Sequence, residues 1–339
     1  MNVRAGDGGA LRLRNWYDYL CLAEATVARF DGHFVAGYFD YEHPTRLQPG
    51  TPRRMRRPYR VRTAYFEWGR RGAPLLICCG GVANSAMRFA FLADALRTRF
   101  RVVCMDWVGR GASGWLVDER DYSSETHVEQ LRQLIDHLDG GPVNLLGSSL
   151  GGSAGIALAA RHPRRVRRLI LNDIGPFMPK RRRSRRAEAL ARHYVFRDPA
   201  DLLRRIGAAQ RNFGPAGDEI RFHLSYHQTR WSEADGGRIY RHDVRALQAY
   251  RRDAAENLDQ WQLWQQVRCP VLVIHGMQSD ALLPATLARM KKGRQLQLMH
   301  VPDTGHTPIL HDPNQIHFID EWLATPRPDR REWCVLHAT

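Results

Sequence analysis

From residue 59 onward, short apolar runs alternate with segments that have a helical pattern of apolar side chains. Runs of this length and composition are typical of strands that are buried on both faces of a sheet. Strands that alternate with helices indicate a mainly parallel, doubly wound sheet, so the predicted fold class is α/β. The predicted strands are Val61–Trp68, Pro74–Gly81, Arg101–Trp107, Pro142–Gly147, Val166–Asp173, Cys269–Gly276 and Leu296–Pro302.

One long interval breaks this alternation. Between Asp173 and Cys269 the chain is helix-like, basic and aromatic, and it contains no buried-strand pattern. A segment of this length inside a compact domain is expected to have a structure of its own. We therefore predict a helical cap over residues 177–262, inserted into an α/β core formed by residues 59–176 and 263–325.

The two ends of the chain lie outside that core. Residues 1–58 have no strand–helix rhythm, although apolar side chains spaced three or four apart predict a helix over Arg14–Phe30. We expect this N-terminal extension to pack on the main domain or on another subunit. Residues 326–339 are expected to form a C-terminal tail. The sequence does not predict an oligomeric state.

The chain is strongly basic, with a formal net charge of +16. Two clusters concentrate the charge, one over Arg53–Arg62 and the other over Lys180–Arg186. Such clusters can attract nucleic acid, an anionic membrane or an acidic substrate, but they are more often solvated surface. No nucleic-acid-binding motif accompanies them, so nucleic acid is not the expected partner.

Several classes of protein are not favoured by the sequence. No apolar stretch is long enough to span a membrane, and the N-terminus lacks the apolar run of a signal peptide, so we expect a cytoplasmic protein. The six cysteines are scattered without metal-ligand spacing, which predicts neither a disulfide framework nor a zinc site. No metal and no cofactor are predicted.

The stretch Gly147-Ser148-Ser149-Leu150-Gly151 lies where a predicted strand ends and a helix begins. It fits the pattern G-x-S-x-G, in which a sharp turn needs glycines two residues before and after a central serine. Ser148 lacks these glycines. Ser153 has them, but it lies within the alanine-rich helix beyond the turn. Ser149 is therefore the predicted nucleophile.

A serine hydroxyl needs a base that takes its proton and a carboxylate that orients the base. His306, in the loop after the last predicted strand, is the expected base, whereas His275, His311 and His317 are expected to be structural. Asp280, after the preceding strand, is the favoured carboxylate. Asp173 and Asp303 remain alternatives.

An oxyanion hole requires two donors near the nucleophile. The Leu150 amide follows Ser149 at the start of a helix. The loop Gly80–Asn84 follows a buried strand, and its two glycines allow a close approach of the backbone to a ligand. We therefore predict the backbone amides of Val82 and Leu150 as the donors.

These motifs resemble those of the α/β-hydrolase family over roughly residues 60–325. The resemblance includes GSSLGG, CCGGVANS, HGMQSD and DTGHTP, together with MDWVGRGASGW, which is similar to the family's loop after its fourth strand. It implies a sheet of the α/β-hydrolase type, a triad of Ser149, Asp280 and His306, and an oxyanion hole from Val82 and Leu150. Gly80-Gly81 replaces the His-Gly pair that many members carry.

The favoured function is therefore a serine hydrolase that cleaves a small-molecule carboxylic ester through an acyl-enzyme. Arginines in the cap favour an anionic substrate, for example a short hydroxy-acid oligomer. Two alternatives stay open. One is a carbon–carbon hydrolase of the ring-cleavage type, although Thr307 stands where those enzymes usually carry Trp. The other is a non-catalytic, arginine-rich binding protein on a hydrolase fold.

The residues that line the substrate pocket are harder to predict, because the cap builds that pocket. Trp107, Arg110, Phe177 and Trp231 are the candidates that the sequence offers.

Overall fold

A computed structural model describes residues 13, 15–44, 58–210, 213–292, 296–326 and 331–338, with the side chains of residues 209 and 210 left out. The first basic cluster, over Arg53–Arg62, falls largely outside these residues. Among the described residues, no helix is both long and apolar enough to cross a membrane.

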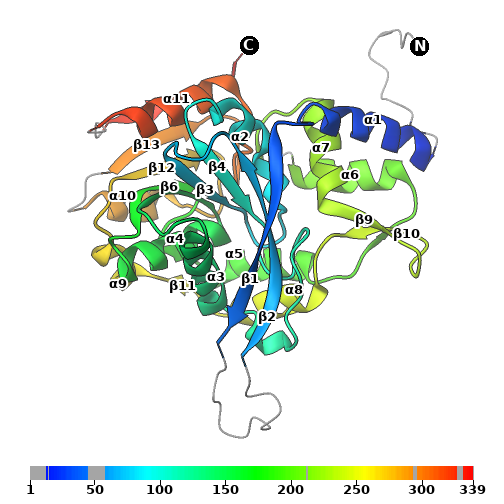
Figure 1. The fold of residues 1–339 in the computed structure, drawn as a ribbon, viewed down its shortest axis with the longest axis horizontal. Coiled ribbons are helices and arrows are strands. Elements are labelled where there is room, and N and C mark those ends of the chain that lie inside the picture. The colour runs from blue at the N-terminus through cyan, green and yellow to red at the C-terminus, as the bar shows by residue number, and fades with distance from the viewer. Residues whose placement is uncertain are drawn as a thin grey trace, which may run out of the picture.

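A nine-stranded, mainly parallel sheet forms the centre of the molecule (Figure 1). Only the first two strands in the spatial order run antiparallel to their neighbours, and all later pairs are parallel. The strands, in spatial order, are β1 (Phe34–His43), β2 (Tyr59–Trp68), β4 (Arg101–Met105), β3 (Leu75–Cys79), β5 (Val143–Ser148), β6 (Val166–Asn172), β12 (Val271–Gly276), β13 (Leu296–Val301) and β14 (Glu332–Cys334). The predicted α/β class is confirmed.

Successive side chains of the central strands enter two different cores, because neighbouring residues of a strand point to opposite faces of a sheet. In β3, for example, Ile77 and Cys79 belong to one core, whereas Leu76 and Cys78 belong to the other. The first core is covered by α3 (Ser124–His137), α4 (Leu150–Arg161), α9 (Trp261–Gln266) and α10 (Pro284–Lys291). The second is covered by the 3-10 helix η2 (Ala86–Phe89), α2 (Ala90–Leu96) and α11 (Pro313–Ala324).

The chain between β6 and β12 forms the inserted segment, but it is not purely helical. Short strands make a three-stranded sheet in the order β8-β10-β9, and β7 pairs with β11 where the insertion leaves and rejoins the core. Its elements are β7 (Phe177–Met178), α5 (Lys180–Leu190), β8 (Val195–Phe196), α6 (Pro199–Gln210), α7 (Asp218–Gln228), β9 (Thr229–Ser232), β10 (Gly237–Tyr240), α8 (Val244–Asp253) and β11 (Leu258–Asp259).

Residues 1–58 do not form one separate extension. Helix α1 (Trp16–Ala28) packs against α7 of the insertion (Figure 1). Its Tyr19 and Ala23 are fully buried in one cluster with Phe196 and Phe222. Strand β1, in contrast, pairs with β2 along its whole length. The expected tail over residues 326–339 likewise contributes β14 to the sheet. The sequence missed β1 and β14 for the same reason. Each is an edge strand that does not take part in the alternation of strands and helices by which the other strands were predicted.

Candidate active site

Ser149 occupies a sharp turn between β5 and α4. Its backbone has φ +50° and ψ −110°, which is an unusual conformation for a residue other than glycine. Such strain is typical of functional positions that the surrounding structure holds in place. The turn places the Ser149 side chain at the carboxyl end of the parallel strands, where open α/β sheets bind their ligands.

Glycine is required on both sides of this serine for a packing reason. A Cβ atom on Gly147 would lie 2.4 Å from the backbone of Gly151 and Gly152, and one on Gly151 would lie 2.3 Å from the carbonyl oxygen of Cys79. The turn can therefore close only if strand and helix approach each other without side chains.

Substitution Gly147→Ala is expected to destabilise the fold by about 3 kcal/mol or more, because the added methyl group meets backbone that cannot move aside. Denaturant unfolding of the purified variant measures the change. Gly141→Ala is a matched control, since an added Cβ there meets no atom within 4 Å. An equal loss in both variants would contradict the packing argument.

A chain of hydrogen bonds leads from Ser149 to a buried carboxylate. The Oγ atom of Ser149 lies 3.1 Å from His306 Nε2, and Nδ1 of His306 lies 2.8 Å from Asp173 Oδ2. The Asp173 side chain is completely buried, and it also accepts hydrogen bonds from the Gly276 amide and the Ser279 hydroxyl. These donors hold the carboxylate in position beneath the imidazole.

The predicted pairing of His306 with Asp280 is therefore wrong. Asp280 lies on the loop after β12, but its half-exposed side chain forms ion pairs with Arg182 and Arg185 of α5. Asp173, which the sequence left as an alternative, directly follows β6 and reaches His306 instead. The other alternative, Asp303, has φ +49° in the turn before the histidine. It forms no hydrogen bond or ion pair with His306 among the described contacts.

The remaining predicted serines and histidines lie elsewhere. Ser153 donates a hydrogen bond to Gln260, and the buried hydroxyl of Ser148 accepts one from Asn172. His275 contacts His300 rather than Ser149, and burial lowers the pKa of His275. Burial also lowers the pKa of His311, and His317 lies on α11.

A buried arginine supports the loop that carries His306. Arg88, from η2, donates hydrogen bonds to the carbonyl oxygen and the hydroxyl of Thr307, the residue that follows His306. Burial lowers the pKa of Arg88 to about 10, so the guanidinium remains charged at neutral pH. The sequence did not point to this contact, because the two residues are far apart along the chain.

The predicted oxyanion-hole residues lie next to each other. Val82 and Leu150 pack in one small apolar cluster, and a Cβ on Gly81 would lie 3.6 Å from the Cβ atom of Ser149. Leu150 is the first residue of α4, so its amide has no acceptor within the helix. The loop Gly80–Asn84 thus runs beside the serine, as its glycines predict.

Trp107 and Arg110 support this loop from behind instead of lining the pocket. Trp107 Nε1 donates to the Gly80 carbonyl oxygen at 2.9 Å, and Arg110 Nε donates to the Val82 carbonyl oxygen at 3.0 Å. Both side chains are almost fully buried. Their prediction as substrate contacts was therefore wrong, although they lie one layer away from the site.

Phe177 and Trp231 do not line the pocket either. Phe177 belongs to the β7/β11 pair, and Trp231 is exposed on β9, where its ring contacts Trp16. The loop Gly80–Asn84, which the sequence indicated, lines the pocket around Ser149 together with six residues of the insertion that the sequence missed. Besides Ser149, His306 and Thr307, its lining residues are Gly81, Val82, Ala83, Asn84, Met178, Arg182, Arg186, Leu190, Phe213 and Tyr250.

This catalytic pocket is narrow and opens into a larger one under the insertion. Its cavity volume is about 40 Å³, whereas the adjoining cap pocket has about 410 Å³. The two share five lining residues, namely Ala83, Asn84, Arg186, Leu190 and Phe213. A substrate that reaches Ser149 must therefore pass or occupy the space that these residues enclose.

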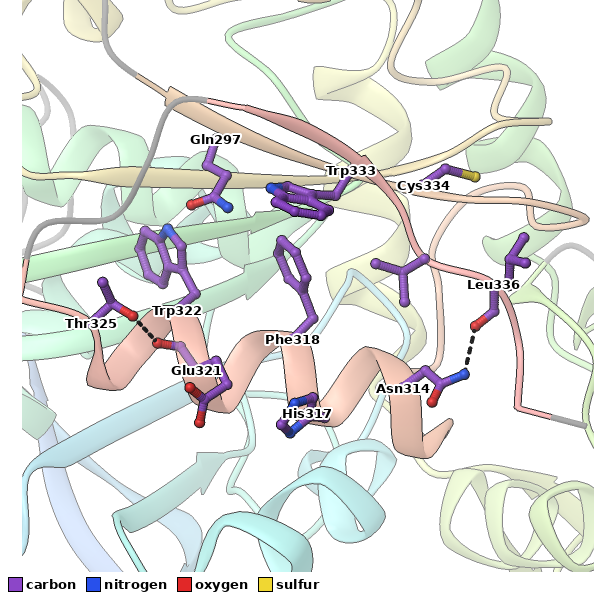
Figure 2. A pocket seen from close by; sticks show the side chains of 11 residues that line it. Gln297, Asn314, His317, Phe318, Glu321, Trp322, Thr325, Trp333, Cys334 and Leu336 are labelled. Carbon is purple, nitrogen blue, oxygen red and sulfur yellow. Dashed lines mark hydrogen bonds between the residues drawn. The ribbon is translucent and has the colours of Figure 1, made fainter.

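A separate apolar hollow lies away from this site, between α11 and β14. Figure 2 shows Trp322 and Phe318 on the helix facing Trp333 of the strand, and the hollow has a volume of about 540 Å³. None of Ser149, His306 and Asp173 lines it. In the described part of the chain, no group of three or more His, Cys, Asp or Glu side chains is arranged to hold a metal ion.

Comparisons with known proteins agree with this fold. A family model described as the alpha/beta hydrolase fold matches residues 73–313. The 3-hydroxybutyrate-oligomer hydrolase of Cupriavidus necator is 32% identical over 264 residues, which cover 75% of this chain and 90% of that enzyme. The 2-(acetamidomethylene)succinate hydrolase of Mesorhizobium japonicum is 26% identical over 235 residues, 69% of this chain and 81% of that enzyme.

A solved structure of a hydrolase from Rickettsia typhi superposes with a TM-score of 0.78 at 23% identity, covering 86% of this chain and 99% of that one. The chain belongs to the alpha/beta hydrolase fold family. It is a hydrolase of that fold, which acts on a small-molecule substrate.

Proposed function

We propose that this chain is a serine hydrolase that cleaves carboxylic esters of hydroxy acids, with Ser149, His306 and Asp173 as its triad. The observation that carries the proposal is the continuous chain of hydrogen bonds from the Ser149 hydroxyl through His306 to the buried Asp173 carboxylate. The similarity to a 3-hydroxybutyrate-oligomer hydrolase supports the choice of substrate class.

In this mechanism Ser149 attacks the ester carbonyl carbon while His306 Nε2 takes its proton. The Asp173 carboxylate accepts a hydrogen bond from His306 Nδ1, which fixes the imidazole and stabilises its cation. The backbone amides of Val82 and Leu150 donate to the oxyanion, and the α4 N-terminus adds partial positive charge. His306 then protonates the leaving alcohol. A water molecule, deprotonated by His306, cleaves the acyl-enzyme and restores Ser149.

The basic run in α5 does not favour the alternative of a nucleic-acid-binding protein. Arg183 is buried against Asp253, and Arg182 and Arg186 line the catalytic pocket. Arg181 and Arg185 remain on the exposed face of the helix. Three of the six basic side chains of this cluster are therefore used inside the molecule, and Arg185 pairs with Asp280, which leaves Lys180 and Arg181 for a phosphate backbone.

A substrate panel tests the proposal. We expect the purified protein to hydrolyse linear 3-hydroxybutyrate dimer and trimer to monomer, and to react with a fluorophosphonate probe. A dienone ring-cleavage product is expected to remain intact. Turnover of that compound without turnover of any ester would favour the carbon–carbon hydrolase instead.

The support of the oxyanion loop can be tested with Trp107→Phe. This change keeps a ring but removes the donor to the Gly80 carbonyl oxygen, so the loop loses one of its fixed contacts. We expect kcat on a p-nitrophenyl ester to fall by about 10-fold with little change in KM, because loop position affects the transition state more than binding. Steady-state kinetics check this, and an increase in KM alone would contradict it.

A further inference from the structure

Arg186 is the one arginine of α5 that lines both the catalytic pocket and the cap pocket. Arg182 and Arg186 are one helical turn apart, so both can face the site, whereas Arg183 faces the body of the insertion. Phe213, Leu190, Ala83 and Asn84 surround the same junction between the pockets. Any substrate that extends from Ser149 into the cap pocket passes the guanidinium of Arg186.

Arg182, Arg183 and Arg185 of α5 each form an ion pair with an aspartate, whereas Arg186 does not. Asp280 pairs with Arg182 and Arg185, and Asp253 pairs with Arg183. Within the described residues, Arg186 has no hydrogen bond and no ion pair. Burial and the nearby Arg182 guanidinium both lower the pKa of Arg186, and the opposing effect of Asp280 is smaller, as expected for a cation that is partly removed from water without a direct ion pair.

The lining of the two pockets contains no acidic side chain among the described residues. It does contain three further arginines. Arg182 pairs with Asp280, and Arg205 pairs with Asp201 and stacks on Tyr194. Arg192 is exposed and lines the cap pocket but not the catalytic pocket. Of the arginines that line the catalytic pocket, Arg186 is therefore the one without an acidic partner among the described residues.

We propose that Arg186 binds a free carboxylate of the substrate and so selects esters whose leaving alcohol carries that carboxylate. The inference rests on the proposed function, because in a linear hydroxy-acid oligomer the terminal carboxylate lies on the alcohol side of every ester bond. A guanidinium presents two parallel N–H groups to a carboxylate, and a partly buried pair of this kind is stronger than one in water.

A matched pair of substrates tests this proposal. 3-Acetoxybutanoate and 3-acetoxybutanamide have the same single ester bond, and they differ only in the charge of the leaving alcohol. The wild-type protein is expected to prefer the anionic ester by about 10- to 100-fold in kcat/KM. In Arg186→Gln the preference is expected to fall to about one, because turnover of the anionic ester decreases. Arg186→Lys should keep part of the preference for the anionic ester.

Arg181→Gln is the matched control. It removes the same charge from the same helix, but Arg181 is exposed and lines neither pocket. We expect its substrate preference to equal that of the wild type. Equal losses on both esters in Arg186→Gln, or a preference that persists in it, would overturn the inference.

A binding measurement separates this inference from the proposed function. Titration calorimetry of Ser149→Ala with 3-hydroxybutyrate requires no turnover, and adding Arg186→Gln should weaken that binding by about 10-fold or more. Undiminished binding would contradict the role of Arg186. A third outcome is that Arg186→Gln weakens the binding of 3-hydroxybutyrate while the wild-type protein cleaves neither of the two esters. That outcome would support Arg186 as a carboxylate site and count against the proposed esterase.

Discussion

Replacing Ser149 by alanine is expected to lower the turnover of p-nitrophenyl esters and 3-hydroxybutyrate dimer by about 10⁴- to 10⁶-fold. The change removes only the hydroxyl group, whose oxygen lies 3.1 Å from His306 Nε2 in the structure. Without it, no acyl-enzyme can form. The residual rate would come from substrate binding and the oxyanion donors, and labelling by a fluorophosphonate should disappear.

The control for this prediction is Ser153→Ala. Ser153 also has glycines two residues before and after it, but its hydroxyl lies within α4 and contacts Gln260. We expect the control to keep most of its activity and all of its labelling. If Ser149→Ala were labelled as fast as the wild type, Ser149 would not be the nucleophile. Circular dichroism of both variants shows whether either one has lost its fold.

The contact between Ser149 and His306 could be predicted from the sequence because the signals for both residues are local. The glycines around Ser149 are needed by the turn itself, and His306 lies in the short loop that follows β13, five residues beyond the last residue of that strand. The oxyanion loop could be predicted for the same reason. In each case the residue and the backbone feature that positions it lie within a few residues of each other.

The carboxylate could not be predicted with the same certainty, because two strands end beside His306 and each is followed by an aspartate. Asp173 comes immediately after β6, whereas Asp280 lies four residues beyond the last residue of β12. That extra length allows Asp280 to turn toward Arg182 and Arg185, which come from a segment about 100 residues away in the sequence. Which of the two aspartates reaches His306 therefore depends on where the folded insertion places Arg182 and Arg185.

The substrate pocket was the least predictable part for a related reason. Trp107 and Arg110 are close to Ser149 along the sheet edge, but their hydrogen bonds to Gly80 and Val82 turn them away from the substrate. Six of the thirteen residues that line the pocket around Ser149, and most of those that line the cap pocket, come from the insertion. Their positions depend on how α5 packs on α8, a contact between elements that no sequence period reveals.

Asp173→Asn is expected to lower kcat on esters by about 10⁴-fold while leaving KM nearly unchanged. An amide keeps the size of the carboxylate, but it cannot stabilise the imidazolium that forms when His306 takes the proton of Ser149. It can also present an N–H group to His306 Nδ1, which favours the wrong tautomer. Steady-state kinetics and the rate of fluorophosphonate labelling should both show the loss.

The matching change, Asp280→Asn, distinguishes the two carboxylates. The Asp280 side chain is half exposed and, among the described contacts, pairs only with Arg182 and Arg185. The pair with Arg185 is exposed and contributes less than about 1 kcal/mol, and the amide oxygen of the variant can still accept a hydrogen bond from the largely buried Arg182, so the fold should persist and kcat should stay within about threefold of the wild type. If instead Asp280→Asn lost about 10⁴-fold in kcat and Asp173→Asn remained active, the loop after β12 would have to rearrange during catalysis. His306 would then take its carboxylate partner from Asp280, as the sequence motif alone suggests.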